Sequence, residues 1–294
     1  AGGSMKRSLV GWLFVAPALI HLVVFALGPI FYAATLSLYN WNLLKGDSRF
    51  VGLQNFTRIW EDGQFAKALL NSALYTITSV PLGIALALAV ALLVAQKIRG
   101  ITIFRTIYYL PAVCSQVAIA MIWIYIFLPK KGMINGVLGW FGLPNETDFL
   151  STPGWAMAAL VFMSIWVALG PRMVLFVSGI LNIPESLYEA AELDGATKNQ
   201  QFWKVTLPLL TPTTFFVGVT SMISAMQVFT PVYMMTKGGP EGTTDVVGYH
   251  IYSAAWERFQ IGEASAMSLV LFVIILALSI GPFRAMNKQV EGAA

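Results

Sequence analysis

Charge is scarce in this sequence. Only 11% of its 294 residues are Asp, Glu, Lys or Arg, whereas 57% are hydrophobic. That leaves too little polar surface to cover a water-soluble globule of this length, so the composition indicates a protein that crosses a membrane several times. The net charge of +4 is scattered over short loops and forms no basic stripe, which argues against nucleic acid as a partner.

Cysteine and histidine are almost absent. The single cysteine, Cys114, lies in an apolar run, which predicts neither a disulfide nor a metal site and favours a packed, inert thiol. His21 and His250 stand far apart, and we expect packing or interfacial roles for both. The sequence offers no nucleophile–base pair and no cluster of metal ligands, so it predicts no catalytic residue and no bound metal.

Two further absences restrict how the chain could drive transport. It lacks the G-x-x-x-x-G-K-[ST] motif, so it cannot bind ATP through a P-loop, and ATP-driven work must come from a partner. All 14 acidic residues fall in predicted loops or at predicted helix ends. A secondary transporter would need ion-coupling carboxylates inside the membrane, so this class is disfavoured.

Long apolar runs predict the fold class. A spanning helix needs about 20 mostly apolar residues. Six stretches qualify: Gly11–Leu38, Leu69–Ala95, Ile101–Leu128, Trp155–Leu181, Leu209–Met235 and Ala264–Met286. We predict an all-α integral membrane protein with six transmembrane helices over residues 11–286, preceded by a cytoplasmic segment at 1–10 and followed by a cytoplasmic tail at 287–294. Within the first segment, Ala1–Ser4 before Met5 resembles a cloning remnant and is set aside.

The positions of Lys and Arg predict the orientation. With the N-terminus inside, ten of the 18 fall on the cytoplasmic side: Lys6, Arg7, Lys97, Arg99, Arg105, Arg172, Lys198, Lys204, Arg284 and Lys288. The short stretch 97–105 is the strongest indicator, because it holds three cations. Both termini are therefore predicted to be cytoplasmic, whereas Phe50–Lys67, a possible amphipathic helix, and the polar loop Lys130–Thr152 are predicted to lie outside.

The only long polar segment on the predicted cytoplasmic side runs from Ile183 to Pro212. Pro184 suits the first turn of a helix, Glu185 suits the positive end of the helix dipole, and Gly195 can take the left-handed conformation that ends a helix. The predicted helix carries an acidic stripe and a flank of mostly small residues: Glu185, Glu189 and Glu192 on the first, Leu187, Ala190, Ala191 and Asp194 on the second. Such a surface lets a partner carrying Arg or Lys approach closely.

This segment resembles the EAA loop of ABC-importer permeases. The match comprises Glu189-Ala190-Ala191, Gly195, Val205 and Leu207-Pro208, and it departs from the family only at Val205, where Ile is more common. The resemblance implies a type I ABC importer permease (MetI-like) fold, with an EAA coupling loop at 183–208 that docks into a groove of a cytoplasmic ATPase subunit. It implies that the ATPase-coupling residues are Glu185, Glu189, Ala190, Ala191, Asp194, Gly195, Leu207 and Pro208. An amphipathic helix lying on the membrane surface is the alternative.

The resemblance also implies partners and a location. An importer of this kind contains a second homologous permease, two ATP-binding cassette subunits that hold ATP and Mg, and an external solute-binding protein, in the cytoplasmic membrane of a prokaryote. This chain would bind no cofactor of its own. A structural or assembly subunit stays a rival class, although such a subunit would be indifferent to the spacing of the EAA residues.

Two outer segments resemble the carbohydrate-uptake subset of these permeases, which includes those for glycerol-3-phosphate: the sequence GLQNF at residues 52–56 and the turn cluster Thr236–Pro240. We therefore expect a sugar or oligosaccharide as substrate, with glycerol-3-phosphate or another polar solute as the alternative.

Polar residues inside the spans are candidates for the solute pathway, because burying them costs free energy unless they are paired or face water. Thr220, Ser224 and Gln227 share one helix face, and Phe229 follows; together they offer the hydroxyl, amide and aromatic groups that a sugar needs. By resemblance to the maltose-type permease, the sugar-contact positions are Ala112, Gln116, Trp166, Gly170, Ser221, Ala225 and Gln227. Ala112 and Ala225 replace larger residues of that family, which indicates a different sugar. Hydrogen bonds between helices are the alternative role.

Arg172 is the one charge well inside an apolar run, and Pro171 before it is expected to kink the helix. At about 1.5 Å per residue, its distance from Trp155 places it in the inner leaflet. Either it extends toward the inner headgroups, or it contacts a partner subunit or lines an inner gate.

Overall fold

The computed structural model describes residues 2–42, 46, 48–96 and 100–291, and the side chains of those between 12 and 280. Two cations of the orientation argument, Lys97 and Arg99, lie outside the described residues, as do the side chains of Lys6, Arg7, Arg284 and Lys288. The chain divides into two compact units. The first comprises Ala1–Phe65 with Ile251–Ile274, and the second comprises Ala66–His250 with Ile275–Ala294.

The predicted all-α class is confirmed, with five to six candidate membrane spans in the described chain. Five helical stretches are long and apolar enough to cross a membrane: Trp12–Leu36, Gln64–Val94, Trp155–Leu181, Thr211–Met235 and Ile261–Ile280. The sixth candidate is a pair of helices, α5 (Ile101–Val113) and α6 (Gln116–Ile126), which meet at 99°. The stretch Ile101–Leu128, predicted as one span, is therefore broken rather than a single rod.

The first unit holds the N-terminal helices, a short hairpin and the start of the last helix. Its elements are α1 (Gly2–His21), a π-helical stretch (Leu22–Leu27), α2 (Gly28–Leu36), β1 (Tyr39–Trp41), β2 (Ser48–Phe50), α3 (Gln54–Glu61), a π-helical stretch (Ser253–Glu257) and the first part of α15 (Ile261–Glu291). The strands are antiparallel, with Asn40 opposite Arg49. Asn55 is buried and donates from Nδ2 to the carbonyls of Ser37 (2.7 Å) and Tyr39 (2.9 Å). The GLQNF segment thus contains a residue that fixes α3 to the end of α2.

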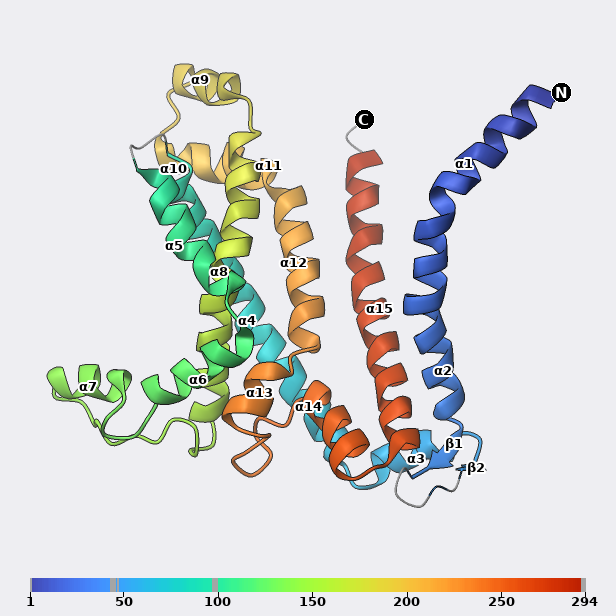
Figure 1. Ribbon diagram of the computed structural model, residues 1–294. Helices are drawn as coiled ribbons and strands as arrows, with labels where there is room; N and C mark the ends of the chain where they lie inside the picture. Colours follow the sequence, from blue (N-terminus) through green and yellow to red (C-terminus); the bar gives the residue numbers. More distant parts are fainter. Residues whose placement is uncertain (1, 43–45, 47, 97–99, 292–294) are drawn as a thin grey trace. The chain divides into compact units, whose positions relative to one another are not determined.

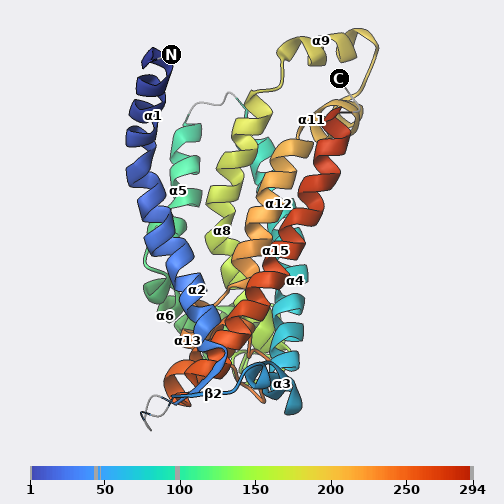
Figure 2. The same cartoon turned by 90° about the vertical axis from the view of Figure 1, so that its right-hand side faces the viewer.

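The second unit holds the remaining helices (Figure 1). They are most of α4 (Gln64–Val94), α5, α6, α7 (Met133–Trp140), α8 (Trp155–Leu181), α9 (Glu185–Leu193), α10 (Lys198–Gln201), a π-helical stretch (Phe202–Thr206), α11 (Leu207–Leu209), α12 (Thr211–Met226), α13 (Thr230–Met235), the start of α14 (Val247–Tyr252) and the last part of α15. In Figures 1 and 2, α8 and α12 run side by side, and in Figure 1 α4 crosses obliquely behind them. The helix α8 coincides with the predicted span and continues through Pro171.

Two of the π-helical stretches end two residues before a proline. The first precedes Pro29, and the second precedes Pro208. A proline ring clashes with the carbonyl four residues earlier in an α-helix. The wider turn lets Gly28 donate to Val23 and Leu207 donate to Phe202, each five residues back. The chain therefore enters each proline without breaking the helix.

Small residues on α4 and α8 allow the helices of the second unit to pack closely. Ala87 and Ala91 of α4 pack with Phe176 of α8 and Val217 of α12, all fully buried. A Cβ placed on Gly170 of α8 would overlap the backbone of α5 at Tyr108 and Tyr109. Close helix approach at small residues is the usual packing mode where lipid supplies no hydrophobic driving force.

Two predictions for the outer segments are refined by the structure, and the prediction for Cys114 is wrong. The predicted loop Lys130–Thr152 contains the helix α7. On α3, Ile59 is buried, whereas Trp60 and Leu53, which directly precedes the helix, are exposed, so the chain itself covers only part of the apolar face of the predicted amphipathic helix. Cys114, predicted to be packed, is exposed at the break between α5 and α6.

Candidate functional site

A polar helix and a pocket are the two candidate sites, and both lie in the second unit. The polar helix is α9, at the end of α8 opposite to α7 (Figure 1). It begins at Glu185, directly after Pro184, and it ends before Gly195, whose φ of +76° is the left-handed conformation expected at a helix stop. The boundaries predicted from the sequence are therefore found within one residue.

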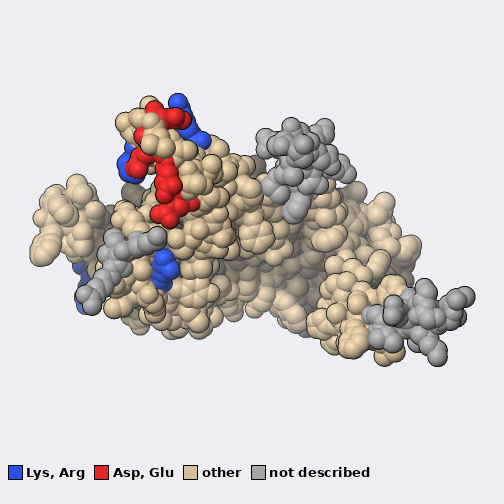
Figure 3. Space-filling model, turned by 90° about the horizontal axis from the view of Figure 1, so that it is seen from above, with Lys and Arg blue, Asp and Glu red and all other residues tan. Residues whose placement is uncertain are grey.

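The described part of the chain buries no residue of α9. Leu193 is 90% exposed and Leu187 is 41% exposed. Figure 3 shows acidic side chains gathered over this part of the molecule. A short helix that presents both carboxylates and leucines to its surroundings has the composition of a docking surface.

Polar contacts with the following segment hold α9 in place. The hydroxyl of Tyr188 lies 2.9 Å from Oγ1 of Thr206. Thr197 caps α10, and the side chain of Gln200 returns the hydrogen bond to the backbone of Thr197. These contacts fix the position of the loop while α9 itself stays largely exposed.

One carboxylate of the predicted acidic stripe is already paired. Lys198 donates to Oε1 of Glu192 at 2.6 Å. This hydrogen bond and the charge of Lys198 lower the pKa of Glu192 below its ordinary value. Glu189 is exposed, so this position offers a partner a carboxylate that Lys198 does not occupy. The sequence did not predict this pair, because it joins residues across the turn at Gly195.

The pocket lies where two helices are broken. One break is at Cys114 and Ser115, between α5 and α6, and the other is at Gln227–Phe229, between α12 and α13. The helices that follow the two breaks, α6 and α13, pack against each other. Broken helices leave backbone groups unpaired inside the membrane region, and this is tolerated where the break lines a water-filled cavity or a binding site.

The cavity has a volume of about 250 Å³ and a mixed polar and apolar lining. Its polar side chains come from four parts of the unit: Tyr75 and Ser79 of α4, Gln116 of α6, Ser164 and Arg172 of α8, and Ser224, Gln227 and Thr230 around the second break. This volume is slightly below the roughly 300–1,000 Å³ that is common for small-molecule sites. It suits a small solute, or one unit of a longer solute.

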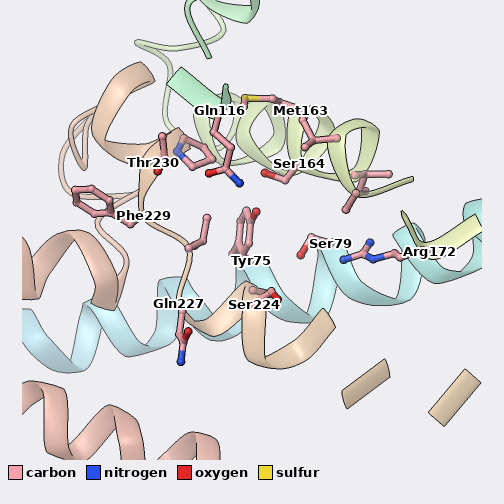
Figure 4. A pocket seen from close by; sticks show the side chains of 16 residues that line it. Tyr75, Ser79, Gln116, Met163, Ser164, Arg172, Ser224, Gln227, Phe229 and Thr230 are labelled. Carbon is pink, nitrogen blue, oxygen red and sulfur yellow. The ribbon is translucent and has the colours of Figure 1, made fainter. Parts of the chain in front are cut away.

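Figure 4 shows how the labelled side chains are oriented around the cavity. The side chain of Gln116 reaches into the cavity, and the hydroxyl of Tyr75 points toward Ser164. The amide of Gln227 points away from the other labelled groups. Hydroxyls and an amide beside the ring of Phe229 are the groups that a polyol could use for hydrogen bonding and stacking.

The structure brings together some of the residues predicted for the solute pathway. Those that line the cavity are Gln116, Ser224, Ala225, Gln227 and Phe229, together with Arg172. Those that do not line it are Ala112, Trp166, Gly170 and Ser221. Trp166 makes an edge contact with Trp123, with ring centroids 5.6 Å apart, and Gly170 lies against α5. The roles of both groups stay predictions.

Sequence reasoning missed the contribution of α4. Tyr75 and Ser79 are buried and line the cavity. They lie four residues apart, on one face of the second predicted span, a spacing that could have identified them. Ser164 was missed as well, on the fourth predicted span.

Comparison with known proteins relates the chain to membrane transport. The family model described as "Binding-protein-dependent transport system inner membrane component" matches residues 79–287, which include α9 and all but one of the residues that line the cavity. That one is Tyr75.

Individual relatives match along nearly the whole chain. The probable ABC transporter permease protein YurN of Bacillus subtilis (strain 168) is 34% identical, with 94% of this chain and 95% of that protein covered. The multiple sugar-binding transport system permease protein MsmF of Streptococcus mutans is also 34% identical, with 95% of each covered. The sn-glycerol-3-phosphate transport system permease protein UgpA of Agrobacterium fabrum is 30% identical, with 97% of each covered.

A solved structure shares the fold. A chain of a bacterial alginate ABC transporter, crystallised with a periplasmic protein that holds an alginate pentasaccharide, superposes with a TM-score of 0.85 at 23% identity. The match covers 98% of this chain and 97% of that one.

Proposed function

Since the chain belongs to the family of binding-protein-dependent transport system inner membrane components, we propose that it is the permease subunit of an ATP-driven importer that moves a carbohydrate inward by alternating access. An external binding protein delivers the solute, a homologous permease completes the path, and two ATPase subunits supply ATP, Mg and hydrolysis. The transporter lies in the cytoplasmic membrane of a prokaryote, with both chain termini cytoplasmic. A carbohydrate is favoured because relatives include a permease of a multiple sugar-binding system.

The observation that carries this proposal is the exposure of α9. A nine-residue helix with no buried residue gains little from its own chain, so its fixed position favours a partner that covers it. Closing of the ATPase subunits would move the two permeases through their α9 helices and would change which side the cavity faces. Glu185, Glu189, Ala190, Ala191, Asp194 and Gly195 are proposed to make the contact, with Leu207 and Pro208 supporting the loop.

The cavity between the broken helices is the proposed solute site. It combines hydroxyl, amide and aromatic groups from four parts of the chain. Glycerol-3-phosphate or another polar solute is the second candidate, because one relative is named for that substrate.

The coupling role is tested in the assembled importer in lipid. We expect Glu189→Lys and Gly195→Asp to abolish solute-stimulated ATP hydrolysis while the complex still unfolds at the wild-type temperature. The matched control is Glu61→Lys, which reverses an exposed carboxylate on α3 and should leave stimulation unchanged. Normal stimulation in both α9 variants would refute the coupling role.

A further inference from the structure

Arg172 brings a positive charge into the cavity that the described residues do not neutralise. Among them, no Asp or Glu forms an ion pair with Arg172. Its Nη1 is buried and has no hydrogen-bond partner in the described part of the chain. Arg172 as a whole is only partly buried, but a buried donor left without a partner still costs about 1–3 kcal/mol, so this arrangement favours a compensating group from outside the chain.

The neighbouring backbone is shaped to admit the guanidinium. Arg172 lies beside Ser79 (Figure 4), one turn from Gly83 on α4. A Cβ at position 83 would overlap Nη1 of Arg172 and would lie 3.3 Å from its Cζ. Glycine at position 83 leaves room for the guanidinium, so the side chain of Arg172 lies against α4 at the edge of the cavity.

The rest of the cavity is also free of negative charge. Its lining contains hydroxyls, amides and apolar groups, and none of the lining residues is Asp or Glu. Gln116 is the first residue of α6, so the positive end of that helix dipole adds to the potential from Arg172. A neutral sugar could be bound by the hydroxyl and amide groups alone and would leave the guanidinium uncompensated.

We propose that the cavity selects an anionic solute, whose acid group binds the guanidinium of Arg172 while its hydroxyls contact Ser79, Gln116 and Ser224. The acid group is an oxyanion, either the carboxylate of an acidic sugar or the phosphate of a sugar or polyol phosphate. Arginine suits both, because its planar set of donors matches two oxygens of either group. This inference rests on the proposed function and narrows its substrate class.

The test measures binding to the assembled importer in lipid nanodiscs, without the external binding protein, by ligand-observed NMR titration. Two matched pairs of probes differ only in the acid group: galacturonate against galactose, and glucose 6-phosphate against glucose. We expect the acidic member of at least one pair to bind roughly tenfold more tightly, the size expected for a hydrogen bond to a charged group. The pair with the larger ratio distinguishes carboxylate from phosphate.

Substitutions test whether Arg172 causes the preference for acidic over neutral probes. Arg172→Gln should reduce the ratio of acidic to neutral affinity to within about twofold. Gly83→Ala keeps the charge but displaces Nη1, at small cost to the fold because the end of a flexible side chain can move, and it should also reduce the ratio. The control Arg49→Gln removes an exposed cation from β2 and should leave the ratio unchanged.

Equal affinity for acidic and neutral probes in the wild type would overturn the proposal, and so would a ratio that survives both Arg172→Gln and Gly83→Ala. Dissociation of the permease pair in Arg172→Gln, with the ratio retained in Gly83→Ala, would also overturn it, since Arg172 would then serve the partner subunit. A separate measurement tests the proposed function. Stimulation of ATP hydrolysis by any saccharide would support an importer even if the cavity showed no preference for acidic solutes.

Discussion

The helix α9 and the cavity both carry charge, but their charges have opposite surroundings. On α9 the carboxylates lie on an exposed helix, and Glu192 already has Lys198 as a partner. In the cavity, Nη1 of Arg172 is buried and has no partner among the described residues. An exposed carboxylate keeps its contact with water and costs little without a partner, whereas a buried donor without a partner costs free energy until another group compensates it. The first arrangement fits a docking surface, and the second fits a solute site.

The largest effect on stability is expected from Gly170→Ala, which tests whether the cavity depends on close helix packing. The new Cβ would lie 2.7 Å from Cα of Tyr109, so backbone must move, at about 1–3 kcal/mol. Thermal unfolding of the complex measures this loss. The control Gly218→Ala meets only the side chain of Ile84, at 3.9 Å, and should be neutral or slightly stabilising. Equal unfolding temperatures for both variants would contradict the packing account.

Gly195→Ala probes the other region with the same chemical change. No atom lies within 4 Å of the added Cβ, but φ is +76°, which costs an alanine about 1–2 kcal/mol. Because the strain is confined to the turn after α9, we expect solute-stimulated ATP hydrolysis to fall while the unfolding temperature of the bundle is kept. Gly195→Asn, which tolerates this conformation better, should retain more activity. An Asn variant as impaired as the Ala variant would argue against backbone strain.

A smaller effect is expected from Tyr188→Phe, which removes the hydroxyl that contacts Thr206. The loss should be about 0.5–1.5 kcal/mol, and it should be local, because the contact joins α9 only to the segment before α12. Hydrogen exchange of the amides of α9 should become faster while exchange in α8 is unchanged. Faster exchange in both helices would mean that α9 supports the bundle, contrary to its exposure.

The smallest effect concerns pH and the pair of Glu192 with Lys198. The pKa of Glu192 is lowered in the folded loop, so the pair contributes stability above the ordinary pKa of 4.5, and this contribution is lost as the pH falls through the lowered value. Amide exchange at the turn after α9, corrected for its intrinsic pH dependence, should report more opening over that range. Lys198→Gln should abolish this pH dependence, and its persistence in that variant would assign the titration to another group.

Much of this organisation follows from local sequence. Apolar runs of about 20 residues predict the spans, and Pro184 and Gly195 delimit α9 to within one residue, because capping and backbone conformation act over a few neighbours. The break between α5 and α6 was not predicted, because the 99° angle between them depends on what packs against the two helices. The same limit applies to Cys114, whose apolar neighbours suggested burial.

The class of the protein follows from its sequence, which has few charges, long apolar runs, no P-loop motif and a long polar segment between two of the runs. Which polar residues share a cavity depends on how the helices pack, because Tyr75, Gln116, Arg172 and Ser224 come from four different helices. Helical periodicity describes each helix separately and cannot bring these residues together. The tertiary structure also decided that Arg172 lies across Gly83, a contact between distant residues. Periodicity and capping are properties of neighbours along the chain, whereas a site for a solute is made by side chains that meet only after the helices pack.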